Sequence, residues 1–107
     1  MKKDQTLLNV LDRLRLDFGG GAYQFVDHWD RDLCAVGIAR NDEPRQLVYI
    51  SVWKCPEGEV AVSLESPPET SDDLYVDRGT CEHCSYSGLR ELIGAHLAIE
   101  PVFQPEP

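Results

Sequence analysis

Two cysteines in the stretch CEHC, residues 81–84, form the pattern most capable of chemistry. Cys81 and Cys84 flank an acidic residue and His83, directly ahead of a helical pattern. Thiolates at this spacing can supply half of a structural zinc site or a redox pair. A tetrahedral zinc site needs four ligands, so Cys55 and either His83 or His96 would have to complete it. The sequence predicts no bound metal, but a site built from Cys55, Cys81, Cys84 and a histidine stays open.

A redox role would rest on Cys84, because the start of a helix lowers the pKa of a thiol and a charged His83 would add to this effect. A thioredoxin-like fold needs further strands and helices after its cysteine pair, and only residues 85–107 follow here. We therefore interpret the stretch as a junction between a strand and a helix. In this interpretation Cys84 packs on Leu89 across a helix cap at Ser85.

The other candidate catalytic groups are histidines. His28 stands close to Asp27, Asp30 and Asp32, and such a cluster could bind a divalent cation or transfer protons. A solvated end of a hairpin is the simpler interpretation, and we adopt it. His96 falls on the apolar face of the last helical pattern, as a hydrogen-bonded core histidine does. Since the sequence has no serine elbow, phosphate loop, Rossmann fingerprint or HExxH motif, we predict neither an enzyme nor a cofactor.

Two amphipathic helices must position these residues. Residues 5–17 carry apolar side chains at i, i+3, i+4 and i+7, and the run of glycines from Gly19 predicts the helix end. Residues 85–99 repeat the apolar spacing. The expected buried faces are Leu7, Val10, Leu11 and Leu14 in the first helix, and Leu89, Leu92, Ile93, His96 and Leu97 in the last. Residues 101–107 form a proline-containing tail, because proline blocks further helix.

Between the helices the chain alternates with period two, which is typical of strands. The expected strands are residues 22–29, 33–40, 46–54 and 59–66, and residues 74–85 can supply a fifth strand broken at Gly79. Short polar connectors at 30–32, 41–44 and 55–58 force antiparallel neighbours, because a parallel crossover needs about a dozen residues or more. The last connector fits a type I turn with Pro56 second and Gly58 fourth. The predicted fold is one α+β domain, residues 1–107, with an antiparallel four- to five-stranded meander and a helix at each end, in the order α-β-β-β-β-(β)-α.

The strand pattern also divides side chains between the two faces of the sheet. Val48, Ile50 and Val52 share one face, and Tyr49 and Trp53 share the other. The aromatic residues of the first strand would all point to the same face of the sheet, because they are separated by even numbers of residues: Tyr23, Phe25 and Trp29. Two helices can cover only one face, so exposed aromatics on the other would make a recognition surface. Coverage by loops and the proline tail is the alternative.

The chain is strongly acidic, with nineteen acidic and ten basic residues and a net charge of −9. This charge would repel nucleic acid and anionic membranes and attract a basic partner protein. Acidity that serves only solubility is the alternative interpretation. The sequence contains no apolar run long enough to span a membrane, and polar residues interrupt any signal peptide. We therefore expect a cytoplasmic protein with reduced cysteines.

The order of elements, together with the acidic surface, resembles that of small bacterial immunity proteins that neutralise toxins. The resemblance covers most of the chain as layout and charge, without a shared motif. It implies a non-catalytic protein-binding module that docks a basic partner through acidic loops and sheet aromatics. The alternatives are an acidic dimer similar to a secretion chaperone, so that a homodimer stays open, and a small metal-binding protein with cysteine and histidine ligands.

The predicted docking surface lies at one end of the sheet, because the first and third turns of a meander share an end. The acidic residues of these turns would form a charged rim around two tryptophans, as at the edge of a protein interface. The predicted partner-binding residues are Trp29, Asp30, Asp32, Tyr49, Trp53, Glu57 and Glu59.

Overall fold

The computed structural model describes residues 3–26, 32–68 and 76–102. It confirms the α+β layout: an N-terminal helix, five strands in chain order, and a closing helix. The elements are α1 (Gln5–Phe18), β1 (Gln24–Val26), β2 (Ala35–Arg40), β3 (Glu43–Ser51), β4 (Glu59–Ser66), β5 (Val76–Ser85) and α2 (Tyr86–Leu97). Neither helix in these ranges is long and apolar enough to cross a membrane.

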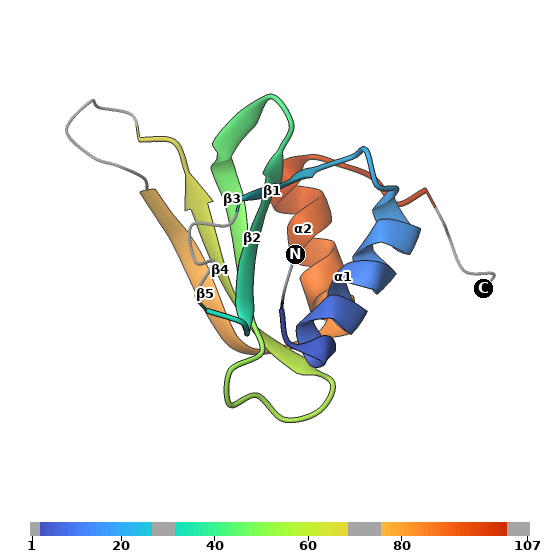
Figure 1. Cartoon of the computed structure of the whole chain (residues 1–107). Coiled ribbons are helices and arrows are strands. Elements are labelled where there is room, and N and C mark those ends of the chain that lie inside the picture. Colours follow the sequence, from blue (N-terminus) through green and yellow to red (C-terminus); the bar gives the residue numbers. More distant parts are fainter. Residues whose placement is uncertain (1–2, 27–31, 69–75, 103–107) are drawn as a thin grey trace.

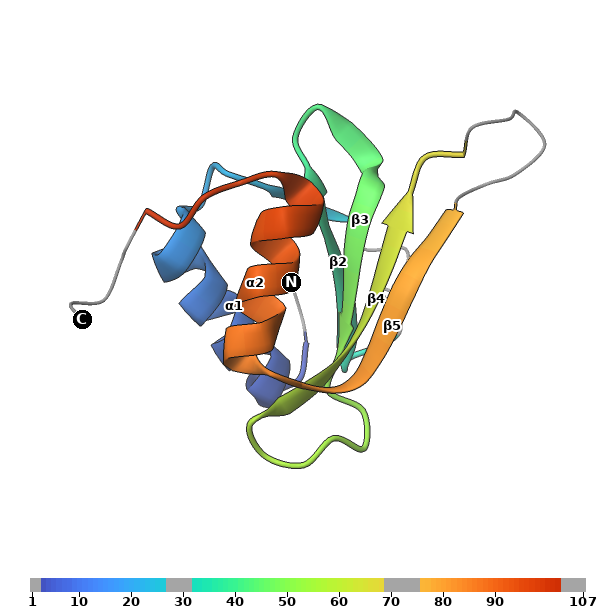
Figure 2. The same ribbon diagram turned by 180° about the vertical axis from the view of Figure 1, so that it is seen from behind.

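The five strands form one antiparallel meander in the order β1-β2-β3-β4-β5. Both helices pack on the same face of this sheet (Figures 1 and 2). The two helices begin at the same end of the molecule, and the connection between β3 and β4 lies at that end too. The fold therefore brings the starts of both helices and the β3–β4 connection together at one end of the molecule. We call this end the Trp53 pole, because Trp53 lies in that connection.

Local signals explain where α1 begins and ends. The carboxylate of Asp4 accepts a hydrogen bond from the Thr6 amide at 2.9 Å, which caps the first turn. Gly19 ends the helix with a φ of 88°, and its amide donates to the Arg15 carbonyl at 2.9 Å. A residue with a Cβ would be strained at that φ, so the predicted glycine stop is confirmed.

The core lies between the sheet and the two helices. Alternate residues of the three central strands face the helices, and the expected apolar faces of both helices meet them. The fully buried side chains are Leu7, Leu14, Phe18, Val36, Ile38, Val48, Ile50, Val62, Leu89, Ile93 and Leu97. Leu92 was expected among them but is only half-buried, because it lies at the edge of the helix face beside Arg78.

The boundaries of β3 differ from the prediction of residues 46–54. The strand starts at Glu43, directly after a two-residue turn, and ends at Ser51. Its pairing with β2 jumps from Ala39↔Leu47 to Arg40↔Glu43, so an irregularity falls at residues 44–46. This segment contains Pro44, which has no amide proton to donate to a neighbouring strand. The proline is thus accommodated inside the strand instead of in the turn.

The connection between β3 and β4 is longer than the single predicted turn. Two consecutive turns form it, closed by hydrogen bonds from the Cys55 amide to the Val52 carbonyl at 3.2 Å and from the Glu59 amide to the Pro56 carbonyl at 3.1 Å. The prediction that Gly58 stands fourth in its turn is wrong: it stands third, with a φ of 85°. That position favours glycine because a Cβ is disfavoured there.

Tyr23, just before β1, and Phe25, within it, lie on the helix side of the sheet and not on the face that the helices leave uncovered, although Phe25 is still 46% exposed. Phe25 pairs with Ile38, a core residue, and Tyr23 is buried beside α1. The Tyr23 and Phe25 rings meet edge to face, with centroids 5.8 Å apart. The register with β2 decides the side to which each residue points, and sequence alternation alone does not supply that register. Residues 27–29 of the predicted first strand lie outside the described residues.

Candidate functional site

The CEHC stretch is a strand that runs directly into a helix, as predicted. β5 ends at Ser85, whose hydroxyl accepts from the Gly88 amide at 3.1 Å and caps α2. Cys84 pairs with Val60 but Cys81 pairs with Val62, so three steps along β5 span two steps along β4. This bulge places both cysteines on the helix side of the sheet. A regular strand would have pointed them to opposite faces.

The bulge leaves Cys84 as a core residue. Its side chain is buried in the same apolar cluster as Leu89. Burial raises the pKa of the Cys84 thiol to about 11, and the neighbouring Cys81 thiol adds to the effect. A protonated thiol is a poor nucleophile and a poor metal ligand. In the described ranges no three histidine, cysteine or acidic side chains converge as a metal site would require.

We expect Cys84 to be the slowest of the four thiols to react in the native protein. At pH 8 a thiol with a pKa of 11 is ionised in only about one molecule in a thousand. Time-resolved alkylation with iodoacetamide, read by peptide mass spectrometry, should label half-buried Cys55 long before Cys84. Labelling in urea provides the unfolded reference. Equal native rates for the two thiols would contradict the buried placement of Cys84.

His96 joins α2 to the sheet. Its Nε2 lies 2.8 Å from the Glu65 carbonyl oxygen and therefore carries the proton of that hydrogen bond. The side-chain amide of Gln46 donates to the His96 carbonyl at 2.9 Å and contacts the ring as well. These contacts hold the end of α2 against β3 and β4. The ring is thus engaged in structural hydrogen bonds, as the sequence pattern predicts.

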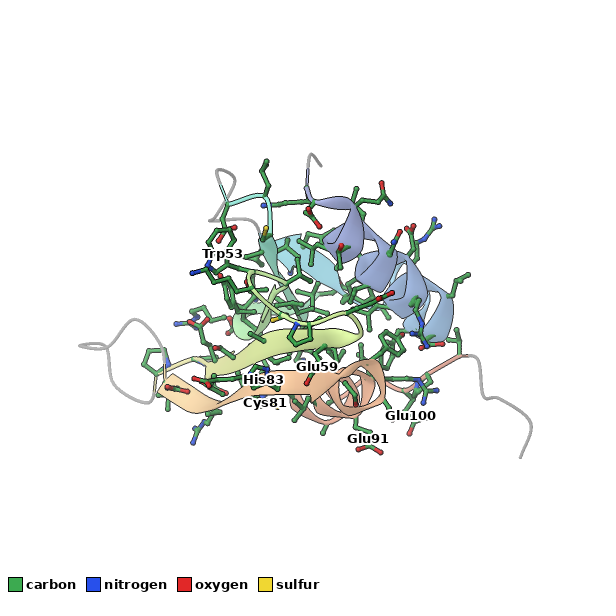
Figure 3. All side chains as sticks on the ribbon, turned by 90° about the horizontal axis from the view of Figure 1, so that it is seen from below. Trp53, Glu59, Cys81, His83, Glu91 and Glu100 are labelled. Carbon is green, nitrogen blue, oxygen red and sulfur yellow. The ribbon has the colours of Figure 1, made fainter. Side chains whose placement is uncertain are left out.

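Trp53, one of the predicted partner-binding residues, exposes a large apolar side chain. Its side chain is 64% exposed, although it belongs to a connection closed by two turns. The Trp53 amide donates to the Ser51 hydroxyl at 3.2 Å, and the Lys54 ammonium lies 5.6 Å from the centre of the indole. Figure 3 shows Trp53 at the outside of the molecule, well apart from Glu59, Cys81 and His83.

Other predicted residues lie near the same pole. The carbonyl of Cys34 accepts from the Val52 amide at 2.9 Å, so the segment after Asp32 meets the start of the β3–β4 connection. Asp32 is exposed, and its charge lies close enough to Tyr49 to help raise the pKa of that phenol, although burial is the larger cause. Tyr49 is half-buried on the face away from the helices. Trp29 and Asp30 lie outside the described residues.

The last two predicted residues, Glu57 and Glu59, line a groove of about 690 Å³. The groove lies between the first half of α1, the β3–β4 connection and the start of α2, and we call it the α1 groove. Side chains that line it include Asn9, Val10, Arg13, Val52, Val60 and Tyr86. A volume of this size is typical of pockets that hold a small ligand or a few side chains of a partner.

The two cations of the α1 groove each lie against an aromatic ring. The Arg13 guanidinium carbon is 3.7 Å from the centre of the Tyr86 ring, and Lys54 lies over Trp53. Tyr86 in turn donates its hydroxyl proton to Asp17, which also pairs with Arg90 at 3.3 Å. Burial and the adjacent Asp17 carboxylate raise the pKa of Tyr86 well above its usual range. Strand and helix periodicity carry no signal for this groove, because its walls come from three separated segments.

Comparison with protein-family models, with curated proteins and with solved structures found no match for this chain.

Proposed function

We propose that the protein is a non-catalytic binding module that docks a basic partner protein, in the manner of an immunity-type inhibitor. The observation that carries the proposal is the exposed indole of Trp53 on a tightly hydrogen-bonded connection. Tryptophan is among the residues that most often dominate the energy of protein interfaces. Hydrogen bonds that restrain a loop before binding also reduce the entropy that the loop loses when it binds.

The charge distribution supports a basic partner. The whole chain carries a net charge of −9, and Asp32 and Glu57 are exposed near the Trp53 pole. Exposed carboxylates around an anchor mainly accelerate association, because they attract an oppositely charged partner over a distance. The apolar anchor then slows dissociation. The partner that fits this surface has a basic face with a pocket for an indole.

The proposed absence of catalysis draws support from three groups capable of chemistry that are already engaged within the fold. The Cys84 thiol is buried and held protonated, and the His96 ring is engaged with the backbone of Glu65 and with Gln46. Asp17 is occupied by Tyr86 and Arg90. These side chains are engaged in contacts within the fold, whereas a catalytic group must be able to reach its substrate.

The test compares Trp53→Ala with Leu16→Ala. Leu16 on α1 is 69% exposed, so its truncation also removes an exposed apolar side chain, but away from the Trp53 pole. Quantitative affinity capture from the native host should identify a basic protein retained by the wild type. The dissociation constant of the purified pair should rise at least about tenfold in Trp53→Ala and stay unchanged in Leu16→Ala. The association rate should also fall as salt increases.

Equal affinity of wild type and Trp53→Ala for every captured partner would refute a docking surface at Trp53. A partner that is acidic, with an association rate independent of salt, would refute the electrostatic part of the proposal.

A further inference from the structure

We infer that the α1 groove receives an extended segment of the partner in which an apolar side chain is flanked by lysine or arginine. This inference rests on the proposed function, since it names the part of the partner that would enter next to Trp53. Trp53 and the groove are continuous, because the residue also lines one wall. A partner anchored at the indole would therefore lie across the mouth of the groove.

The apolar part of the inference comes from the floor of the groove. Val10 from α1, Val52 from the start of the β3–β4 connection, Val60 from β4 and the Tyr86 ring from α2 line it together. Val52 and Val60 belong to the core, whereas Val10 is only half-buried against it. An apolar side chain placed there would complete the burial of Val10 and would lose its own contact with water.

The basic part of the inference comes from charge complementarity. Three carboxylates line the groove: Asp4, Glu57 and Glu59. Asp4 uses one oxygen to cap α1, whereas in the described part of the chain the side-chain carboxylates of Glu57 and Glu59 form no hydrogen bond or ion pair. The two cations, Arg13 and Lys54, already face aromatic rings. The carboxylates are thus available to a ligand's cations, and lysine or arginine flanking the apolar side chain would reach them.

A library of random linear peptides displayed on phage provides the probe, selected against the wild-type protein. The groove-filling variant is Asn9→Arg, which adds bulk and positive charge from an exposed position on α1. The matched control is Leu16→Arg, which makes the same charge change on the same helix at a position that does not line the groove. Neither substitution touches the core, so both proteins should fold.

We expect the enriched peptides to carry an aromatic or large aliphatic residue next to lysine or arginine. Their affinity should fall at least about tenfold in Asn9→Arg and remain unchanged in Leu16→Arg. The double variant Glu57→Gln/Glu59→Gln should weaken binding by about the same factor, and Glu100→Gln, which lies beyond the far end of α2 and does not line the groove, should not. Chemical-shift changes on adding a synthetic peptide should centre on the Val60 and Tyr86 amides.

Three results would overturn the inference. The first is a selection without enrichment, and the second is enrichment of acidic peptides, which would indicate an anionic occupant drawn by Arg13 and the start of α1. In the third, the peptides bind Asn9→Arg as tightly as wild type but lose affinity in Trp53→Ala. That last result would leave the proposed docking at Trp53 intact and remove only the groove, so failure of the inference is distinguishable from failure of the proposed function.

Discussion

Phe18→Ala should lower the free energy of unfolding by about 3–5 kcal/mol, the range observed when large aromatic side chains are truncated in protein cores. Phe18 is the last residue of α1 and is 1% exposed. Its ring faces Gly94 of α2, where a Cβ would lie 3.8 Å from it. Alanine would leave a cavity between the two helices that neither backbone can close. Urea denaturation followed by circular dichroism measures the loss.

Leu16→Ala is the matched control for this prediction. Leu16 lies two residues earlier on the same helix but is 69% exposed, so its truncation should change the stability by less than about 0.5 kcal/mol. The two substitutions have similar effects on helix propensity, and only the burial differs greatly. A loss below about 1 kcal/mol in Phe18→Ala would mean that α1 does not pack on α2 as described.

The regular elements of this fold could be predicted because each is specified locally. The leucine spacing of α1 and the glycine after it, and the Ser85 cap of α2, are signals contained within a few residues. Short polar connectors then favour antiparallel pairing between strands that follow one another in the chain. The single apolar stripe of each helix predicts that the helix packs one side against the sheet.

Features that depend on register could not be predicted in the same way. Which face Phe25 occupies is set by its pairing with Ile38, and the irregularity at Pro44 changes the pairing of β3 with β2. The bulge that turns Cys81 and Cys84 to one side depends on the pairing of β5 with β4. A shift by one residue reverses the faces of a strand, and alternation within that strand does not reveal it.

The candidate site, too, could be predicted only in part from the sequence. The sequence indicated that Trp53 and the carboxylates Glu57 and Glu59 lie near one turn, because they are close in the chain. It did not indicate Val10, Arg13 or Tyr86 as their neighbours, since these come from two helices whose positions depend on tertiary packing. Clusters assembled from distant segments leave no spacing rule in the sequence.

Asp17→Ala should lower the free energy of unfolding by about 2–3 kcal/mol, because Asp17 serves two partners on α2 at once. Its carboxylate accepts the Tyr86 hydroxyl proton and pairs with Arg90, and the two side chains of this ion pair are only 18% and 27% exposed. Removing the carboxylate leaves a half-buried phenol without its acceptor. Adding Tyr86→Phe to Asp17→Ala should then cost less than Tyr86→Phe costs alone, because both changes remove the same hydrogen bond.

The same contact predicts a sensitivity to alkaline pH. The pKa of Tyr86 is raised in the folded state, by burial first and by Asp17 second, above the value of about 10 for an unfolded tyrosine. Below pH 10 both states hold the proton, and the contribution of Tyr86 to stability is complete. Above pH 10 the unfolded state releases the proton first, so stability falls as pH rises. Tyr86→Phe should therefore flatten the decline in stability that urea denaturation measures between pH 9 and 11. Part of the decline should remain, because the pKa values of Tyr23, Tyr49 and Cys84 are also raised.

Comparison with Asp42 shows why hydrogen-bond geometry alone does not predict how much stability is lost when a carboxylate is removed. Asp42 forms two hydrogen bonds with Arg40, at 2.9 and 3.0 Å, which is a closer pairing than that of Asp17 with Arg90. The Asp42 side chain is 70% exposed, however, and water replaces its interaction readily. Asp42→Ala should leave the midpoint of urea denaturation unchanged, whereas Asp17→Ala should shift it to lower urea. Equal shifts for the two variants would mean that surface pairing, and not the contact between α1 and α2, determines the stability of this fold.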